Sequence, residues 1–269
     1  IGSGKRSSMK IQLGDLEVAY TVQGVGPPVV LIHGLAEDKT SWSGVQDWLE
    51  DFRTLAYDFR GHGETTLGEA DGTLEQLGSD LIAFLEQVTG PAQCVGYSLG
   101  GTLVLWTAMQ RPELVTAAVV TGTSTVVGRQ AVGFFDERIR MIEQDFDAFA
   151  PALQKDTALQ IVNSAVDLEA VTAGRLEAVG NGGGYVNASR AMMRLHENPL
   201  TPLLAKIQCP VSVIGGTEDV FCPRKAADIM LAELPNGSYQ EVANAGHLLS
   251  VDQPEAYATA IHTALQRQN

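Results

Sequence analysis

Short apolar runs alternate with longer stretches of helical periodicity along most of the chain. Nearly uninterrupted runs occupy residues 29–32, 53–57, 92–95, 115–120 and 210–214, and such runs are typical of strands covered on both faces. Between them, apolar residues recur every three or four positions, which predicts helices over residues 41–49, 74–88, 102–109, 223–234 and 254–266. Strands and helices that alternate in this way predict a mostly parallel sheet with helices on both sides.

The N-terminal part departs from this pattern. Residues 10–13 and 16–23 alternate apolar and polar positions around Gly14-Asp15, which predicts an antiparallel hairpin. With a last strand at residues 239–242, the predicted fold class is α/β, a doubly wound and mostly parallel sheet of about eight strands. Residues 1–8, ahead of Met9, are interpreted as the remnant of an expression vector.

Residues 124–196 contain no convincing strand, only helical stretches that are rich in Ala, Phe and Met. Because this segment falls between two sheet strands, it should lie over the carboxyl ends of the strands, where open α/β sheets bind ligands. We therefore expect a helical lid over residues 124–196, inserted into a core of residues 9–123 and 197–269. Most of the large apolar side chains should pack the lid itself, and others should line a site. The prominent ones are Phe134, Phe135, Met141, Phe146, Phe149, Met192 and Met193.

Charge and cysteine content narrow the function classes. A net charge of −14 argues against nucleic acid or an anionic membrane as partner, because a phosphate surface requires clustered Lys and Arg. No apolar run approaches the roughly 18 residues of a membrane span, and no signal peptide is recognisable. Cys94, Cys209 and Cys222 form no C-x-x-C pair. They are expected to be reduced thiols in a cytoplasmic protein.

The stretch with the clearest chemistry is Gly96-Tyr97-Ser98-Leu99-Gly100, between the run at 92–95 and the helix at 102–109. The pattern G-x-S-x-G fits a sharp strand-to-helix turn, the nucleophile elbow, in which glycines avoid clashes and the serine is exposed. A serine in that position lies at a helix N-terminus, where backbone N–H groups stabilise a developing negative charge.

Three further motifs accompany the elbow: His33-Gly34, Asp58-x-Arg60-Gly61-His62-Gly63, and Ala245-Gly246-His247. In this order the four motifs resemble those of α/β-hydrolase fold proteins of the lidded, single-domain kind. The resemblance covers nearly the whole chain from Met9 onward and is weakest in the lid.

The resemblance implies a serine hydrolase. In the α/β-hydrolase family the nucleophile, the acid and the histidine follow one another in the chain. The residues of this sequence that match them are Ser98, Asp219 and His247. The backbone N–H groups of Leu35 and Leu99 match its oxyanion hole. No cofactor and no metal are implied.

Other polar residues near these motifs receive less prominent roles. Glu218 is the only nearby rival to Asp219 as the acid. His33 and His62 are interpreted as structural residues that brace loops. Glu37, close to the expected oxyanion hole, is interpreted as a solvated loop charge. Cys222 has no neighbour that would activate a thiolate.

We expect a small carboxylic ester or lactone as the substrate, cleaved through an acyl-enzyme on Ser98. Residues 215–220 (GGTEDV) and the Asp58 motif look somewhat like those of enol-lactonases of aromatic catabolism. Arg129 or Arg190 could bind one substrate carboxylate. Two alternatives stay open: a hydrolase of carbon–carbon bonds in aromatic ring-cleavage products, and a small-molecule receptor on the same fold. The oligomeric state is not predicted.

Overall fold

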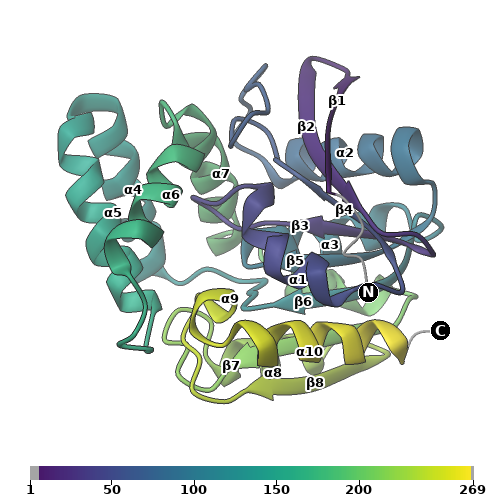
Figure 1. Ribbon diagram of the computed structural model, residues 1–269. Coiled ribbons are helices and arrows are strands. Elements are labelled where there is room, and N and C mark those ends of the chain that lie inside the picture. The colour runs from purple at the N-terminus through teal and green to yellow at the C-terminus, as the bar shows by residue number, and fades with distance from the viewer. Residues whose placement is uncertain (1–5, 268–269) are drawn as a thin grey trace.

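The computed structural model describes residues 6–267, and its centre is one eight-stranded sheet (Figure 1). The strand order is β1-β2-β4-β3-β5-β6-β7-β8. β1 and β2 form the predicted hairpin, β2 runs antiparallel to β4, and every other neighbouring pair is parallel. The predicted fold class is therefore confirmed. The strands are β1 Ser7–Leu13, β2 Leu16–Gln23, β3 Pro28–Ile32, β4 Arg53–Tyr57, β5 Ala92–Tyr97, β6 Val115–Thr121, β7 Val211–Gly216 and β8 Gly237–Val242.

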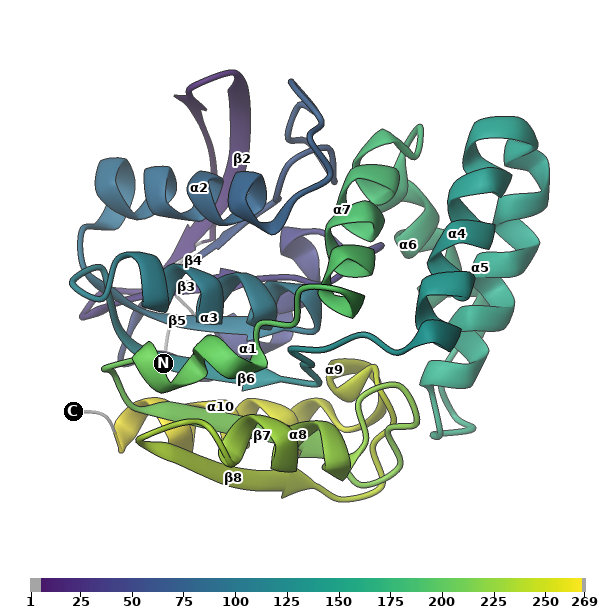
Figure 2. The same cartoon turned by 180° about the vertical axis from the view of Figure 1, so that it is seen from behind.

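Helices cover both faces of the sheet, as Figures 1 and 2 show from opposite sides. One face packs against α2 (Leu74–Phe84), α3 (Leu99–Gln110) and α8 (Arg224–Leu231), and the other against α1 (Ser43–Trp48) and α10 (Pro254–Gln266). Alternate residues of β3 divide between the two apolar clusters: Val30 and Ile32 join the first, and Val29 and Leu31 the second. This period of two explains why the central strands are apolar throughout.

Two elements begin earlier in the structure than the sequence predicted. The helix expected from residue 102 begins at Leu99, directly after the elbow serine, because the turn needs no residues beyond the elbow itself. β1 already includes Ser7 and Ser8, which pair with Val22 and Thr21. Of the segment interpreted as a vector remnant, residues 1–5 lie outside the described residues.

Four α-helices lie between β6 and β7, beside the carboxyl ends of the parallel strands (Figure 1). They are α4 (Arg129–Gln144), α5 (Phe146–Gln160), α6 (Leu168–Val179) and α7 (Gly183–Met193). None of the helices in the described part of the chain is long and apolar enough to cross a membrane.

Several close contacts attach these helices to the rest of the fold. A Cβ on Gly184 of α7 would lie 2.2 Å from the carbonyl oxygen of Gly61, so the two backbones approach in a way that only glycine allows. In the loop that follows α5, the N–H groups of Val162 and Asn163 donate hydrogen bonds to the Asp252 carboxylate at 3.0–3.1 Å. The four helices are therefore attached to the core at the α5–α6 loop and at the start of α7.

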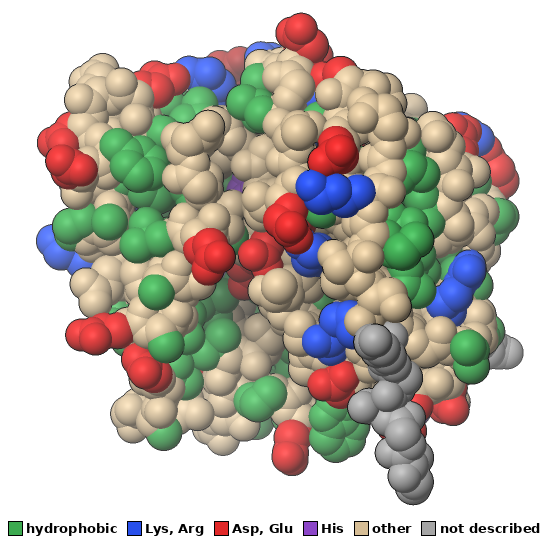
Figure 3. All heavy atoms as spheres, turned by 45° about the horizontal axis from the view of Figure 1, so that its top comes forward, with side chains coloured by type: hydrophobic (Ala, Val, Ile, Leu, Met, Phe, Trp, Pro, Cys, Tyr) green, Lys and Arg blue, Asp and Glu red, His purple; other side chains and the backbone are tan. Residues whose placement is uncertain are grey.

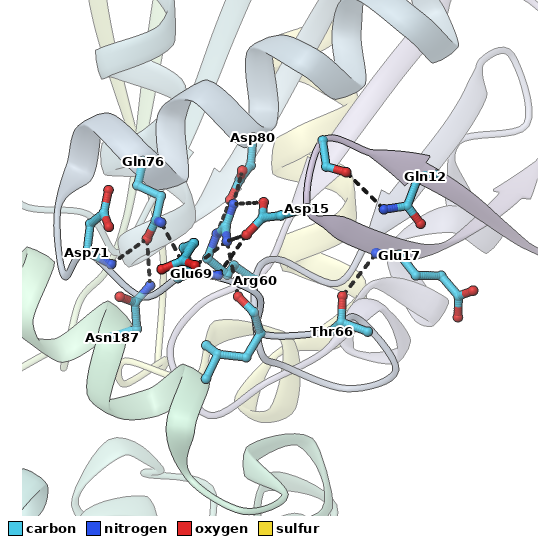
Figure 4. A network of polar contacts seen from close by, with 12 residues as sticks. Gln12, Asp15, Glu17, Arg60, Thr66, Glu69, Asp71, Gln76, Asp80 and Asn187 are labelled. Carbon is cyan, nitrogen blue, oxygen red and sulfur yellow. Dashed lines mark hydrogen bonds and ion pairs between the residues drawn. The ribbon is translucent and has the colours of Figure 1, made fainter.

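The arginine of the Asp58 motif organises the loop after β4 (Figure 4). Arg60 is buried, and its guanidinium donates hydrogen bonds to both carboxylate oxygens of Asp15 and of Asp80, at 2.7–3.0 Å. The hydrogen bonds from Arg60 lower the pKa of Asp15 to about 2. This network joins the β1–β2 turn, the loop after β4 and α2. The arginine of the Asp58 motif therefore has a structural role. On the face seen in Figure 3, acidic and basic side chains are interspersed with apolar ones.

Candidate active site

Ser98 lies at the turn between β5 and α3, and its backbone is in a conformation that favours glycine. Its φ is 52° and its ψ −118°. The turn is tight: a Cβ on Gly96 would lie 2.3 Å from the Gly100 carbonyl oxygen, and a Cβ on Gly100 2.2 Å from that of Ile32. The glycines of the motif are therefore required sterically, and the Ser98 N–H is held by the Thr121 carbonyl at 2.8 Å.

The structure brings the three predicted residues together from three separate loops. Ser98 Oγ lies 3.2 Å from His247 Nε2, and His247 Nδ1 lies 2.8 Å from Asp219 Oδ2. The tautomer that satisfies both contacts carries its proton on Nδ1, which donates to the carboxylate, and leaves Nε2 as the acceptor for the serine hydroxyl. This arrangement can carry a proton from the serine to the imidazole.

Asp219 is held in its charged form by its surroundings. Burial opposes ionisation, but the nearby His247 and the hydrogen bond from it outweigh this effect. Further hydrogen bonds come from the N–H groups of Phe221 and Cys222 to Oδ1, at 2.8 and 2.9 Å. The pKa of Asp219 consequently lies below its ordinary value. The Glu218 side chain is exposed, and within the described residues the carboxylate that contacts His247 is that of Asp219.

The two predicted oxyanion donors come from the start of α3 and from the loop after β3. Leu99 is the first residue of α3, so its N–H has no acceptor within the helix. Leu35 follows β3 in a loop whose direction is set by His33. His33 Nδ1–H donates to the Gly34 carbonyl at 2.8 Å, and His33 Nε2 accepts from the Phe59 N–H at 3.2 Å. Because a trans peptide orients its C=O and N–H in opposite directions, this hydrogen bond also orients the N–H of Leu35.

A cavity of about 490 Å³ opens onto Ser98 and His247. Apolar side chains form one part of its wall: Leu35, Tyr97, Val126, Val127, Ala131, Phe134, Phe135, Leu153, Met192, Val220 and Phe221. Polar side chains from α5, α6 and α7 form another: Asp156, Gln160, Arg175 and Tyr185. The cavity is large enough for a small organic substrate with a polar and an apolar end.

The aromatic and methionine residues of the helical segment take different places. Phe134, Phe135 and Met192 line the cavity. Phe149 is fully buried and packs with Leu153, Val179 and Tyr185 inside the segment itself.

Two predictions about charged residues need correction. Glu37 was expected to be solvated, but only 8% of its surface is exposed, and burial raises its pKa. The reason is that the helices α5–α7 cover its loop. Glu37 lines a second, smaller cavity of about 280 Å³. The second correction concerns a carboxylate site at Arg129 or Arg190: Arg129 is exposed, and Arg190 forms an exposed ion pair with Glu143.

Arg175 is the Lys or Arg side chain that lines the cavity within residues 6–267, and the sequence did not single it out. No motif surrounds it, and it is one of several arginines on helices with charged neighbours. Burial cannot be predicted for such a residue from the sequence alone.

Asp219, Cys222 and His247 place possible metal-ligating atoms within 4.8 Å of one another. However, Asp219 and His247 are already engaged with each other. Burial raises the pKa of the Cys222 thiol well above its ordinary value, so the thiol stays protonated and is a poor ligand. The group therefore fits proton transfer better than it fits a cation.

Comparison with known proteins bears on the family to which the chain belongs. Residues 29–260 match the alpha/beta hydrolase family. The chain is 25% identical over 269 residues to 3-oxoadipate enol-lactonase 2 of Acinetobacter baylyi, covering 95% of each. It is 27% identical over 269 residues to (E)-2-((N-methylformamido)methylene)succinate hydrolase of the same organism, covering 96% of this chain and 98% of that one. The crystal structure of the enol-lactonase from Burkholderia xenovorans LB400 superposes with a TM-score of 0.85 at 21% identity, covering 96% of this chain and 100% of that one. The chain belongs to the alpha/beta hydrolase family.

Proposed function

We propose that this protein is a serine hydrolase that cleaves a small carboxylic ester or lactone through an acyl-enzyme on Ser98. The observation that carries the proposal is the chain of contacts from Ser98 Oγ through His247 to Asp219, at 3.2 and 2.8 Å. The enol-lactonase relative, at 25% identity over most of both chains, supports an ester or lactone as the bond class.

The geometry supports a two-step reaction. His247 Nε2 accepts the proton of Ser98 as the hydroxyl oxygen attacks the substrate carbonyl, and Asp219 stabilises the resulting imidazolium. The N–H groups of Leu35 and Leu99 then stabilise the carbonyl oxygen as it becomes an anion. Collapse of the tetrahedral intermediate transfers the His247 proton to the departing alkoxide or enolate. A water molecule, deprotonated by the same imidazole, hydrolyses the acyl-enzyme and regenerates Ser98.

The helices α4–α7 serve in this proposal as a lid that determines which substrates enter. They supply Phe134, Phe135 and Met192 to the cavity wall, which should bind a compact apolar group without strict shape selection. The attachments of Gly184 and of residues 162–163 to the core limit how far this lid opens.

A fluorophosphonate probe tests the proposal. It should label wild-type protein on one residue, and Ser98→Ala should abolish both labelling and ester turnover. Ser250→Ala provides the control, because Ser250 lines the smaller cavity and not the one at His247, and it should retain labelling. Peptide mapping of the label to another serine would contradict the assignment.

A panel of esters, lactones and vinylogous diketones then identifies the bond that is cleaved. Turnover of an ester or lactone supports the proposal. Turnover of the diketones alone would replace it with carbon–carbon bond hydrolysis, and binding without any turnover would replace it with a receptor.

A further inference from the structure

Arg175 on α6 contacts the loop that supplies one of the two proposed oxyanion donors. Its guanidinium Nε donates to the carbonyl oxygen of Ala36 and its Nη2 to that of Leu35, each at 3.4 Å. A third hydrogen bond, from Nη1 to Thr157 Oγ1 at 2.8 Å, holds the guanidinium against α5. Only 9% of the Arg175 surface is exposed.

The loop itself has a conformation that needs support. Ala36 has a φ of 60°, in the left-handed region that favours glycine, and it is completely buried. It packs against Phe149, Val179 and Tyr185 of the lid helices. Buried carbonyl groups require hydrogen-bond donors, and Arg175 provides them for two consecutive peptides of this turn.

These contacts determine where the Leu35 N–H points. The peptide before Leu35 is held through the Gly34 carbonyl by His33, and the peptide after it is held through the Leu35 carbonyl by Arg175. With both flanking peptide planes fixed, Leu35 has little freedom to rotate its N–H away from Ser98. We propose that Arg175 is a positioning residue for the oxyanion hole, so that the lid is a structural part of the hole and not only its cover. The inference rests on the proposed serine hydrolase function.

Arg175 also lines the substrate cavity, so a direct role in binding an acidic substrate must be distinguished from a positioning role. The contacts favour positioning, because three of the five guanidinium N–H groups already donate to protein oxygens, two of them to the backbone of this loop. A substrate-binding role would affect acidic substrates selectively, whereas positioning should affect neutral esters too.

The test compares a neutral short-chain ester with the thionoester that has the same acyl and alcohol groups. Sulfur accepts hydrogen bonds weakly, so the oxyanion hole favours the oxygen ester. Arg175→Met should lower kcat for the oxygen ester by about tenfold to a hundredfold, since a single oxyanion donor contributes about a hundredfold or more. The KM for the oxygen ester should stay within about threefold of the wild-type value. The kcat for the thionoester should fall much less than that for the oxygen ester. Arg175→Lys has fewer N–H donors, so its kcat for the oxygen ester should lie between those of the wild type and of Arg175→Met.

Arg138→Met is the matched control. Arg138 is also a lid arginine, and it donates hydrogen bonds to both carboxylate oxygens of Asp156, at 2.7 and 2.8 Å. Within the described chain it forms no hydrogen bond to residues 34–37. It should keep the wild-type ratio of kcat/KM between the two esters. Because that ratio is measured on one preparation, it does not depend on the fraction of folded enzyme.

Two results would overturn the inference. In one, Arg175→Met lowers kcat/KM for both esters by the same factor, as a merely structural role requires. In the other, the ratio is unchanged and the defect is a raised KM for acidic esters. In either case continued fluorophosphonate labelling of Ser98 in the wild type leaves the proposed function standing, whereas absence of labelling removes the proposed function itself.

Discussion

Lowering the pH from 7 to 5 is expected to destabilise the folded protein through His62, whose ring lies close to that of His33 at the end of β3. The imidazole is completely buried, its Nδ1–H donates to the Arg60 carbonyl at 3.3 Å, and its Nε2 has no hydrogen-bond partner within the described residues. Its ring centroid lies 5.6 Å from that of His33. Burial, followed by the positive charge that His33 can carry, lowers the pKa of His62 to about 3.

The size of the effect follows from proton linkage. An unfolded chain presents a histidine with a pKa of about 6.5. The folded state, with its pKa near 3, binds fewer protons, so stability is intact above pH 6.5 and is lost as the pH falls from there toward 3. At pH 5, protonation stabilises the unfolded state by about 2 kcal/mol, against about 0.2 kcal/mol at pH 7. This free-energy difference between pH 5 and pH 7 hardly depends on the pKa of His62 in the folded state, provided that this pKa remains below about 4.

Urea unfolding at pH 7, 6 and 5 measures this contribution. His62→Asn should be less stable than the wild type at pH 7, but its loss of unfolding free energy between pH 7 and pH 5 should be about 2 kcal/mol smaller. Leu77→Ala controls for general destabilisation, because Leu77 is a fully buried residue of α2 without a titratable group. It should show the wild-type pH dependence at a lower stability. The reasoning is refuted if His62→Asn loses as much stability on acidification as the wild type does.

Three further predictions concern the site. Asp219→Asn should lower kcat by roughly 10³–10⁴-fold while Glu218→Gln loses far less, and steady-state kinetics showing the reverse order would contradict the choice of acid. Gly100→Ala should reduce the unfolding free energy by about 1–3 kcal/mol in denaturant melts, because its Cβ would lie 2.2 Å from the Ile32 carbonyl oxygen. Its control, Gly133→Ala on α4, has open space and should be neutral or slightly stabilising. In an acyl chain-length series, kcat/KM should stop rising below about ten carbons, because the cavity of about 490 Å³ holds only a small ligand; a continuing rise or a jump at the micelle threshold would indicate a lipase.

The local sequence predicted the features that depend on a few adjacent residues. The apolar run of β3 indicated burial on both faces because its alternate side chains meet different helices. The elbow was recognisable because its steric demands fall on Gly96, Ser98 and Gly100, which are neighbours in the chain. The resemblance of four motifs in a fixed order predicted the α/β-hydrolase fold, and the family match confirms it.

The tertiary structure alone decided which polar residues of the two cavities are buried and what they contact. Glu37 and Arg175 look like ordinary surface charges in the sequence, and their burial arises where α6 packs on the loop after β3. Arg175 is 140 residues from the Leu35 carbonyl that it contacts. Periodicity within an element reports which of its faces is buried, but not which distant loop will lie against that face. A guanidinium therefore acquires its partners only when the helices dock, because its hydrogen bonds depend on positions that no local pattern encodes.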